Sequence, residues 1–415
     1  MPEKKKTAVP RLRFPEFRDA GPWEVKRLGE LSDVRDGTHD SPKFYNVGKP
    51  LVTSKNLLPD GSLDLNNVNL ISDGDYEQIN KRSKVDAGDI LFGMIGTIGN
   101  PVMVNSEGFA IKNVALIKEK NGLLNKYLVH FLNSQYITQK IHILMSGNSQ
   151  KFIALGKIRG LTFPVPKIEE QQKIADCLSS LDDLIRAEAS RLEALKNHKK
   201  GLMQQLFTHE GETIPRLRFS KFRDAGPWEM RRLGEVCEIN PPSGPLPPSF
   251  VYIDLESVED GELIQKKVIY QKDAPSRAQR VLRKGDVIYQ MVRPYQRNNL
   301  LFEPDDSQNY VASTGYAQLR AKVSNVFLYQ LIHTEPFTKS VIEKCTGSNY
   351  PAISSSDLAK VRVGIPSFPE QQKIADCLSS LDDLIRAQGE RIEVLKQHKK
   401  GLMQQLFPSL DEVRG

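Results

Sequence analysis

The chain has 415 residues, enough for two to four domains that each bury a core. Hydrophobic residues make up 39% and charged residues 26%, which is typical of a folded globular protein and excludes a largely disordered one. The formal net charge of +7 is compatible with a polyanionic partner, but charge alone does not establish one.

Targeting and redox signals are few. No apolar run reaches the length of a membrane span, and the first residues, MPEKKKTAVPRLRF, lack the apolar stretch of a secretion signal. We therefore expect a cytoplasmic protein with no membrane partner. The four cysteines form no CxxC pair and no Cys/His spacing suited to zinc, so we expect reduced thiols and no metal site.

A repeated framework block opens each half of the chain. Residues 9–31, VPRLRFPEFRDAGPWEVKRLGEL, match residues 214–236, IPRLRFSKFRDAGPWEMRRLGEV. A repeat of this size decides the fold assignment before any local pattern does. It predicts two related domains, one in each half of the chain.

The segments after the framework blocks, roughly 32–160 and 237–360, differ greatly from each other. Faint correspondences remain: AGDIL at 87–91 matches KGDVI at 284–288, and SGNSQKF at 146–152 stands where TGSNYPA stands at 346–352. Short Val/Ile/Leu-rich runs with Gly, Pro, Asn and Asp between them predict many short strands and a few helices in each segment. We therefore expect two mixed α/β domains, with structural GD turns at Gly88-Asp89 and Gly285-Asp286.

A period-seven apolar pattern follows each variable segment. The residues at 170–187, EQQKIADCLSSLDDLIRA, recur letter for letter at 370–387, and HKKGLMQQLF at 198–207 recurs at 398–407. Spacings of four and three alternate over more than four heptads, which predicts a coiled coil. The seam comprises Ile174, Leu178, Leu181, Ile185, Leu192 and Leu195 in the first copy, and Ile374, Leu378, Leu381, Ile385, Ile392 and Leu395 in the second.

These helices define the expected architecture. Each has about 38 residues and would be roughly 57 Å long. Because the chain holds two similar seams, the simplest partner for each helix is the other, in an antiparallel pair with one globular domain at each end and a pseudo-twofold axis. The expected divisions are 1–168 and 208–368 for the globular domains, 169–207 for the first helix, and 369–415 for the second helix with the carboxy-terminal tail.

This organisation resembles that of the specificity subunits of type I restriction-modification systems. The resemblance rests on the doubled helix sequence, on DGTHDSP at 36–42 and on GDILFGMIGTIG at 88–99, and it covers essentially the whole chain. DGTHDSP occurs only in the first domain, so the two domains should read different half-sites.

The resemblance carries specific expectations. It implies two target recognition domains that each read half of a bipartite, asymmetric site on double-stranded DNA. It implies two methyltransferase subunits held by the helical regions, with translocase-nuclease subunits added for restriction. It places S-adenosylmethionine, ATP and Mg on the partner subunits, leaves no cofactor on this chain, and associates the chain with the nucleoid through DNA.

The second domain carries the stronger basic segment, residues 277–299. Arginine can donate two hydrogen bonds to guanine, and Gln or Asn can pair with adenine, whereas other cations would contact phosphates. A solvated surface with ordinary charges is the alternative. The candidate DNA-binding residues here are Arg277, Gln279, Arg280, Gln290, Arg293, Tyr295, Gln296 and Arg297.

The first domain offers a more scattered set of candidates. Gly- and Asn-rich turns allow close approach of the backbone to a ligand, but they also simply make turns. The candidate DNA-binding residues are Thr38, His39, Lys43, Lys55, Asn56, Lys81, Arg82, Lys84, Lys112 and Asn113.

Catalytic signatures are missing, so we expect no catalytic residues on this chain. The segment at 240–243, Asn-Pro-Pro-Ser, is similar to an amino-methyltransferase motif, but Ser243 replaces the aromatic residue that would stack on a flipped base. No phosphate-binding GxxxxGK[ST] loop and no HExxH sequence occur. Two alternatives stay open: a protein-only coiled-coil scaffold, and a DNA methyltransferase or nuclease in its own right.

Overall fold

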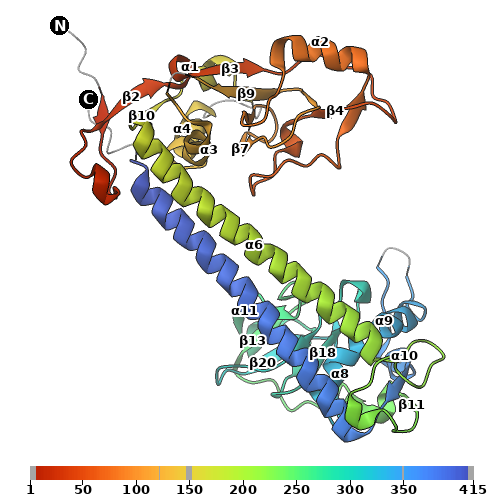
Figure 1. The fold of residues 1–415 in the computed structure, drawn as a ribbon. Coiled ribbons are helices and arrows are strands. Elements are labelled where there is room, and N and C mark those ends of the chain that lie inside the picture. The colour runs from red at the N-terminus through yellow and green to blue at the C-terminus, as the bar shows by residue number, and fades with distance from the viewer. Residues whose placement is uncertain (1–5, 121, 146–151, 348–349, 410–415) are drawn as a thin grey trace. The chain divides into compact units, whose positions relative to one another are not determined.

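The computed structural model describes residues 6–120, 122–145, 152–347 and 350–409 (Figure 1). Most of the SGNSQKF segment and the last residues of the carboxy-terminal tail lie outside this described part. The chain divides into two compact units, the first made of residues 1–189 with 391–415 and the second of residues 190–390. Each unit therefore contains one globular domain and a part of both long helices. Within the described part, no helix is both long and apolar enough to cross a membrane.

The globular part of the first unit is a mixed α/β domain. Its strands are β1 (Thr7–Ala8), β2 (Trp23–Arg27), β3 (Ser32–Asp36), β4 (Lys49–Val52), β5 (Asn69–Ile71), β6 (Ile90–Gly93), β7 (Gly99–Met103), β8 (Ala110–Ile111), β9 (Val114–Glu119) and β10 (Thr162–Val165). Its helices are α1 (Leu28–Leu31), α2 (Asp73–Ser83), α3 (Asn125–Leu132), α4 (Gln135–Met145) and α5 (Leu155–Arg159), with 3-10 turns at Pro15–Phe17 and Ser54–Asn56.

The second unit repeats this composition. Its strands are β11 (Glu229–Arg232), β12 (Cys237–Ile239), β13 (Ser249–Ile253), β14 (Val258–Glu259), β15 (Glu262–Leu263), β16 (Lys267–Tyr270), β17 (Ala278–Val281), β18 (Val287–Gln290), β19 (Leu300–Leu301), β20 (Tyr310–Ser313), β21 (Tyr316–Ala321) and β22 (Arg362–Ile365). Its helices are α7 (Leu233–Val236), α8 (Asn325–Ile332), α9 (Glu335–Ile342) and α10 (Ser355–Ala359), with 3-10 turns at Ser220–Phe222, Gln271–Asp273 and Pro294–Gln296.

The two variable segments share one topology although their sequences differ. The main sheet has the strand order β3-β9-β6-β7 in the first unit and β12-β21-β18-β19 in the second. A smaller sheet contains a parallel pair in each unit, β4 with β8 and β13 with β20. The internal repeat therefore extends through the segments in which the amino-acid sequence no longer reveals it.

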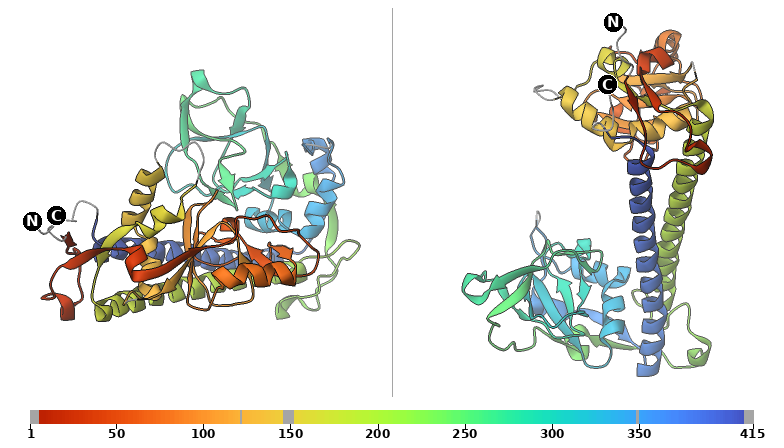
Figure 2. Two further views of the ribbon diagram at one scale, coloured as in Figure 1. Left: turned by 90° about the horizontal axis from the view of Figure 1, so that it is seen from above. Right: turned by 90° about the vertical axis from the view of Figure 1, so that its left-hand side faces the viewer.

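The main sheet of the first unit is buried on both faces. Alternate residues of a strand point to opposite faces, so Ile90 and Phe92 of β6 enter the core that contains α3 and α4, while Leu91 between them enters a second core beneath β4. In the second unit, Val287 and Ile288 divide in the same way. Helices α8 and α9 and the end of α6 belong to the unit that holds these strands (Figure 2).

The predicted GD turns are structural in both units. The Asp89 carboxylate is buried and accepts a hydrogen bond from Lys118 Nζ at 2.6 Å on the neighbouring strand. Asp286 is also buried and accepts hydrogen bonds from Arg320 and from Gln318 Nε2. Each carboxylate thus joins a tight turn to the adjacent strand by a charge-assisted contact.

The two long helices are α6 (Ile168–Leu206) and α11 (Phe368–Leu406), each of 39 residues. The sequence predicted their first residues to within one position, because proline at 166 and 366 disfavours helix before it. In the first unit, Lys399 pairs with Asp182 and Arg391 pairs with Glu188. In the second unit, Lys199 pairs with Asp382. Both units therefore join a part of α6 to a part of α11.

The first seam residues of each long helix also belong to the core of a globular domain, which the heptad pattern did not indicate. Ile174 and Leu178 lie in the core of the first globular domain, as Ile374, Leu378 and Leu381 lie in the core of the second. Ile392 is buried, and the remaining seam residues, Leu181, Ile185, Leu192, Leu195, Ile385 and Leu395, are half-buried. The first turns of each helix are thus part of a domain core as well as of a helix surface.

A buried Arg–Glu–Trp clasp joins the framework block to the start of the long helix. In the first unit, Arg13 donates two hydrogen bonds to Glu170, at 2.8 and 2.6 Å, and Trp23 Nε1 donates a third at 3.0 Å. The Arg13 and Glu170 side chains are only 7% and 3% exposed. In the second unit, Arg218 and Trp228 bind Glu370 in the same manner.

The same framework block also holds the end of the other long helix. Leu12 N donates to Gln405 O at 3.0 Å in the first unit, and Leu217 N donates to Gln205 O at 2.9 Å in the second. Phe407 packs against Phe131, with ring centroids 5.0 Å apart. Each block therefore links the start of one long helix to the end of the other, which accounts for its near-identity in the two halves.

We predict that Glu170→Gln strongly destabilises the first unit. The amide cannot neutralise Arg13, and an uncompensated buried charge costs about 3–5 kcal/mol. Chemical denaturation followed by fluorescence, with Trp23 as a reporter, should show an early transition. The exposed neighbour provides the control, since Glu169→Gln should leave the curve unchanged. Equal behaviour of the two variants would contradict a stabilising role for the clasp.

Candidate nucleic-acid interface

A polar cluster in the first unit surrounds His39. Strand β3 ends at Asp36, and Gly37 follows because a Cβ there would lie 2.2 Å from the Ile111 carbonyl oxygen. His39 Nε2 lies 3.0 Å from Asp36 Oδ2, and Nδ1 lies 2.9 Å from Asn113 Oδ1. Arg82 pairs with the other oxygen of Asp36. The sequence candidates His39, Arg82 and Asn113 therefore meet around one carboxylate.

This geometry favours the charged form of His39. Both ring nitrogens face oxygen acceptors, so both can donate only when the imidazole is protonated. The hydrogen bonds to Asn113 and then to Asp36 raise the pKa of His39 above 6.5, against the effects of desolvation and of Arg82. Asp36 was not among the residues predicted from the sequence, although its position three residues before His39 was a usable signal.

The other candidates of the first unit fall into two groups. Thr38 forms a bridge with Lys112, whose Nζ donates to Ser41 Oγ at 2.6 Å, so both lie beside the His39 cluster. The exposed lysines are Lys43, Lys55, Lys81 and Lys84, of which Lys84 pairs with Asp86. Asn56 differs from all of these because it is buried, and its amide bonds Thr53, Asp64 and Asn67. It is therefore not available for a base contact in this structure.

The basic segment of the second unit contains two kinds of cation. Arg297 pairs with Glu335 at 2.9 Å and therefore has a structural contact. Arg277, Arg280 and Arg293 have no acidic partner among the described residues. Arg280 is half-buried, and its Nε has no hydrogen-bond partner in the described part of the chain. Among the predicted candidates of the second unit, these three guanidinium groups are the cations without an acidic partner in the described part of the chain.

The remaining candidate DNA-binding residues of the second unit differ in solvent exposure. Tyr295, Gln279 and Gln296 are exposed, and Gln279 Nε2 donates to Ser276 O at 2.8 Å. Gln290 is buried, and both ends of its amide are occupied by the loop that follows it. In this structure Gln290 therefore has no free amide donor or acceptor for the predicted base contact. Tyr350, which stacks on Arg293, was missed because nothing local in the sequence relates two positions so far apart.

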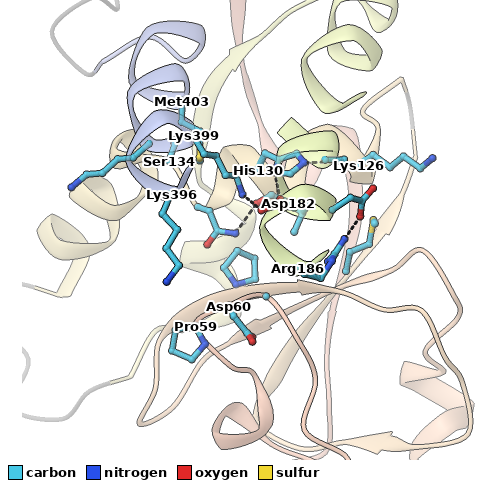
Figure 3. A pocket seen from close by; sticks show the side chains of 18 of the residues that line it. Pro59, Asp60, Lys126, His130, Ser134, Asp182, Arg186, Lys396, Lys399 and Met403 are labelled. Atoms are coloured by element: carbon cyan, nitrogen blue, oxygen red, sulfur yellow. Dashed lines mark hydrogen bonds and ion pairs between the residues drawn. The ribbon is translucent and has the colours of Figure 1, made fainter. Parts of the chain in front are cut away.

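A cleft of about 830 Å³ lies between α3, the first half of α6 and the last turns of α11 in the first unit (Figure 3). In this cleft, Asp182 pairs with Lys399 and lies 3.7 Å from His130 Nδ1, and His130 Nε2 lies 3.0 Å from Ser179 Oγ. Burial first, then Lys399, lowers the pKa of His130 to about 4, so the ring is neutral at pH 7.

The second unit has a matching cleft of about 990 Å³ beside α8 and α9. Here Asp382 pairs with Lys199 and accepts a hydrogen bond from Gln330 Nε2 at 2.8 Å. Each globular domain thus places a different side chain beside the same framework carboxylate, His130 in the first and Gln330 in the second. Both clefts contain cations and carboxylates in nearly equal number, so they differ from the one-signed groove that a polyanion requires.

Within the described part of the chain, no cluster of three His, Cys, Asp or Glu side chains could hold a metal ion. Asn240, the first residue of the Asn-Pro-Pro-Ser segment, donates to Ser355 Oγ at 2.8 Å and accepts from Gln318 N. Its amide therefore ties the turn after β12 to the start of α10 and to β21.

Two α/β domains with one strand order, each with its own exposed polar and cationic groups, define a two-domain recognition protein built on repeated long helices. Comparison with known proteins identifies the family within this class to which the chain belongs. A family model, the type I restriction modification DNA specificity domain, matches residues 21–197 and 226–397. The matches span most of the chain, so the chain belongs to this family, and the resemblance found in the sequence is confirmed.

Similar proteins agree with this membership. The MjaVIII type I restriction enzyme specificity subunit of Methanocaldococcus jannaschii is 24% identical over 421 residues, covering 95% of this chain and 93% of that protein. The HindI specificity subunit of Haemophilus influenzae is 29% identical over 173 residues, covering 40% of this chain and 37% of that protein. The crystal structure of a type I restriction-modification S subunit from M. genitalium has the same fold, with a TM-score of 0.60 at 16% identity over 97% of this chain and all of that chain.

We predict that His39 titrates above pH 6.5 and that Asp36→Asn lowers its pKa. The neutral amide cannot stabilise the imidazolium by charge, although it preserves the size of the side chain. NMR titration of the His39 ring protons would measure both values. Because the folded-state pKa is raised, the stabilisation that His39 contributes is complete below pH 6.5 and is lost as the pH rises through its folded pKa.

The control for this titration is Asp40→Asn, which changes an exposed carboxylate one residue from His39. It should leave the pKa of His39 nearly unchanged. A pKa of His39 at or below 6.5 in the parent protein would contradict the arrangement of donors described for the cluster.

Proposed function

We propose that this chain is the specificity subunit of a type I restriction-modification complex and reads a bipartite, asymmetric site on double-stranded DNA. The observation that carries the proposal is the pair of globular domains with one topology and different exposed groups: a His39–Arg82 cluster in the first and free arginines in the second. Membership of the DNA specificity family supports it. The chain supplies recognition and carries no catalytic activity of its own.

The domains recognise DNA as residues 1–168 and 208–368, and α6 and α11 form an antiparallel coiled coil that separates the two half-sites. The ion pairs support this pairing: as α6 advances from Asp182 to Glu188, the partner on α11 moves back from Lys399 to Arg391. Half-sites one helical turn apart lie about 34 Å centre to centre, a distance that helices of 39 residues can span.

Two methyltransferase subunits bind the helical regions, one to each copy of the repeated sequence. Leu184 and Leu384 support this assignment, because they occupy the same place in the two identical segments and are 39% and 53% exposed. Asp183–Arg186 and its copy Asp383–Arg386 flank these leucines. An exposed apolar group within a segment that is identical in both copies is the kind of residue that a protein partner buries.

Cofactors belong to the partner subunits in this proposal. S-adenosylmethionine would be bound by the methyltransferase, and ATP and Mg by the translocase-nuclease subunits that join for restriction. The chain itself acts in the cytoplasm, on DNA of the nucleoid.

We predict that Leu184→Asp and Leu384→Asp each remove one methyltransferase from the complex and that the double variant binds none. A charged carboxylate would have to be desolvated in the contact that the leucine makes. Native mass spectrometry of the co-purified complex would count two, one and zero copies. Val394→Asp serves as the control, because Val394 is an exposed apolar residue of α11 whose counterpart in α6 is alanine.

Two results would oppose this assignment. The parent complex could contain one methyltransferase for each specificity chain, or the Val394→Asp variant could lose the partner as completely as the leucine variants do. Either result would place the partner on another surface.

The function is tested by mapping methylated bases across the host genome with the gene intact and with the gene deleted. We expect a split, asymmetric methyladenine motif that disappears on deletion, because the methyltransferase then lacks a reader. An unchanged pattern, with the methyltransferase shown to be expressed, would favour a protein-only scaffold. Methyl transfer by the purified chain alone would favour an enzyme.

A further inference from the structure

The two units have a loop at the same place in the main sheet. In the first unit it connects β6 to β7, and in the second it connects β18 to β19. Both loops begin after a methionine whose carbonyl accepts a hydrogen bond from a distant isoleucine: Ile153 N to Met94 O at 2.9 Å, and Ile353 N to Met291 O at 3.0 Å. The correspondence therefore rests on backbone contacts as well as on the faint sequence matches at 87–91 with 284–288 and at 146–152 with 346–352.

The two loops share an unusual backbone conformation but not the residues that favour it. In the first unit, Gly96 and Gly99 are left-handed, with φ of 75° and 93°, and Asn100 after them has φ of 45°. In the second unit, Arg293 and Arg297 stand at the positions that match the two glycines, with φ of 53° and 56°. A side chain in this conformation is strained where glycine is not, so the contacts of the two arginine side chains are the place to look for a function.

Buried side chains on the core side of the second unit's loop support its backbone. The buried Gln290 donates to Gln296 Oε1 at 2.8 Å and accepts from Asn298 N at 3.2 Å. The buried Asn299 accepts from Gln290 N at 2.8 Å, and its amide lies 3.3 Å from His333 Nε2. Two of the sequence candidates, Gln290 and Gln296, are thus parts of a support that keeps the strained backbone in one shape.

Contacts within the chain explain the presence of one of the two arginines, Arg297, at its left-handed position. Arg297 pairs with Glu335 at 2.9 Å and donates to His333 O, so it fastens the loop to the start of α9. Arg293 makes no ion pair in the described part of the chain. Its guanidinium lies 4.4 Å from the centroid of the Tyr350 ring, which is 64% exposed. A guanidinium that lies over a ring contacts it through its face, so its in-plane N–H donors stay available to another partner.

We propose that Arg293 donates two hydrogen bonds to the major-groove edge of a guanine in the half-site read by the second domain, with Tyr350 as its positioning residue. The proposal rests on the proposed function and names the base contact. A stacked, planar donor pair on a rigid loop matches the O6 and N7 acceptors of guanine. A phosphate contact needs no such support. Arg277 and Arg283 are exposed, make no ion pair within the described ranges and stand at unstrained positions, so they can fill that role.

The proposal implies that the two half-sites are read by different chemistry at this position. The matching loop of the first unit has no cation: glycine stands at the positions that match Arg293 and Arg297, and the residues around them are Ile95, Thr97, Ile98 and Asn100. The first domain therefore cannot make the equivalent guanine contact with this loop.

The test uses the complex reconstituted with its methyltransferase and a randomised DNA duplex library, with methylated positions read by long-read sequencing. The decisive variant is Arg293→Gly, because glycine relieves the backbone strain while it removes the donors. We expect its melting temperature to equal or exceed that of the parent. We also expect the preference for guanine at one position of one half-site to fall by about 5- to 150-fold, the range of one bidentate contact.

Two further variants separate positioning from contact. Tyr350→Ala should weaken the preference at that same position, and Tyr350→Phe should restore it, since phenylalanine keeps the ring face. Arg277→Ala is the matched control, which should lower affinity evenly for all sequences without relaxing any position.

Three results would overturn the proposal. An even loss of affinity for all sequences in Arg293→Gly, with a shallower salt dependence, would indicate a phosphate contact. Loss of the methyltransferase from the variant complex would indicate a protein contact. An unchanged motif would show that Arg293 reads no base. Failure of the proposed function is recognised separately, because the parent complex would then select no motif at all.

Discussion

The structure depends on one buried carboxylate in each half of the chain. Glu170 and Glu370 each accept hydrogen bonds from a guanidinium and an indole of the framework block, and removal of the guanidinium would leave the carboxylate as an unpaired charge in a dry environment. The clasp therefore couples two stretches of sequence that are far apart, the PRLRF…GPW block and the EQQ start of the helix. That coupling explains why these stretches are kept together while the segments between them vary.

The variable segments show how a fold is preserved when most side chains change. What persists is a set of strand pairings and a few polar contacts that fit more than one residue type. The carboxylate of the GD turn is neutralised by Lys118 in one unit and by Arg320 in the other. The carboxylate on the long helix is met by His130 in one and by Gln330 in the other. Exposed positions are free of these constraints and can be used for recognition.

The sequence predicted the elements whose patterns are local. Heptads predict α6 and α11, and proline before each helix indicates where it begins. The residues of the candidate DNA-binding surface were harder to predict, because the burial of a side chain depends on pairings between strands that no local pattern reveals. Asn56 and Gln290 have the chemistry of base readers, yet both are buried and bonded to backbone or loop groups. Conversely, Tyr350 gains its role only when the fold brings it to Arg293.

The placement of Phe407 has a consequence for the order in which the protein matures. This ring completes the aromatic core of the first unit, against Tyr127 and Phe131, but it is synthesised after the whole of the second unit. The second unit consists of one continuous stretch, 190–390, and contains its own Phe207. The half that is synthesised first is therefore completed after the other half. Until residues 391–407 have been synthesised, the apolar surface that Phe407 covers in the first unit stays exposed and is prone to aggregation.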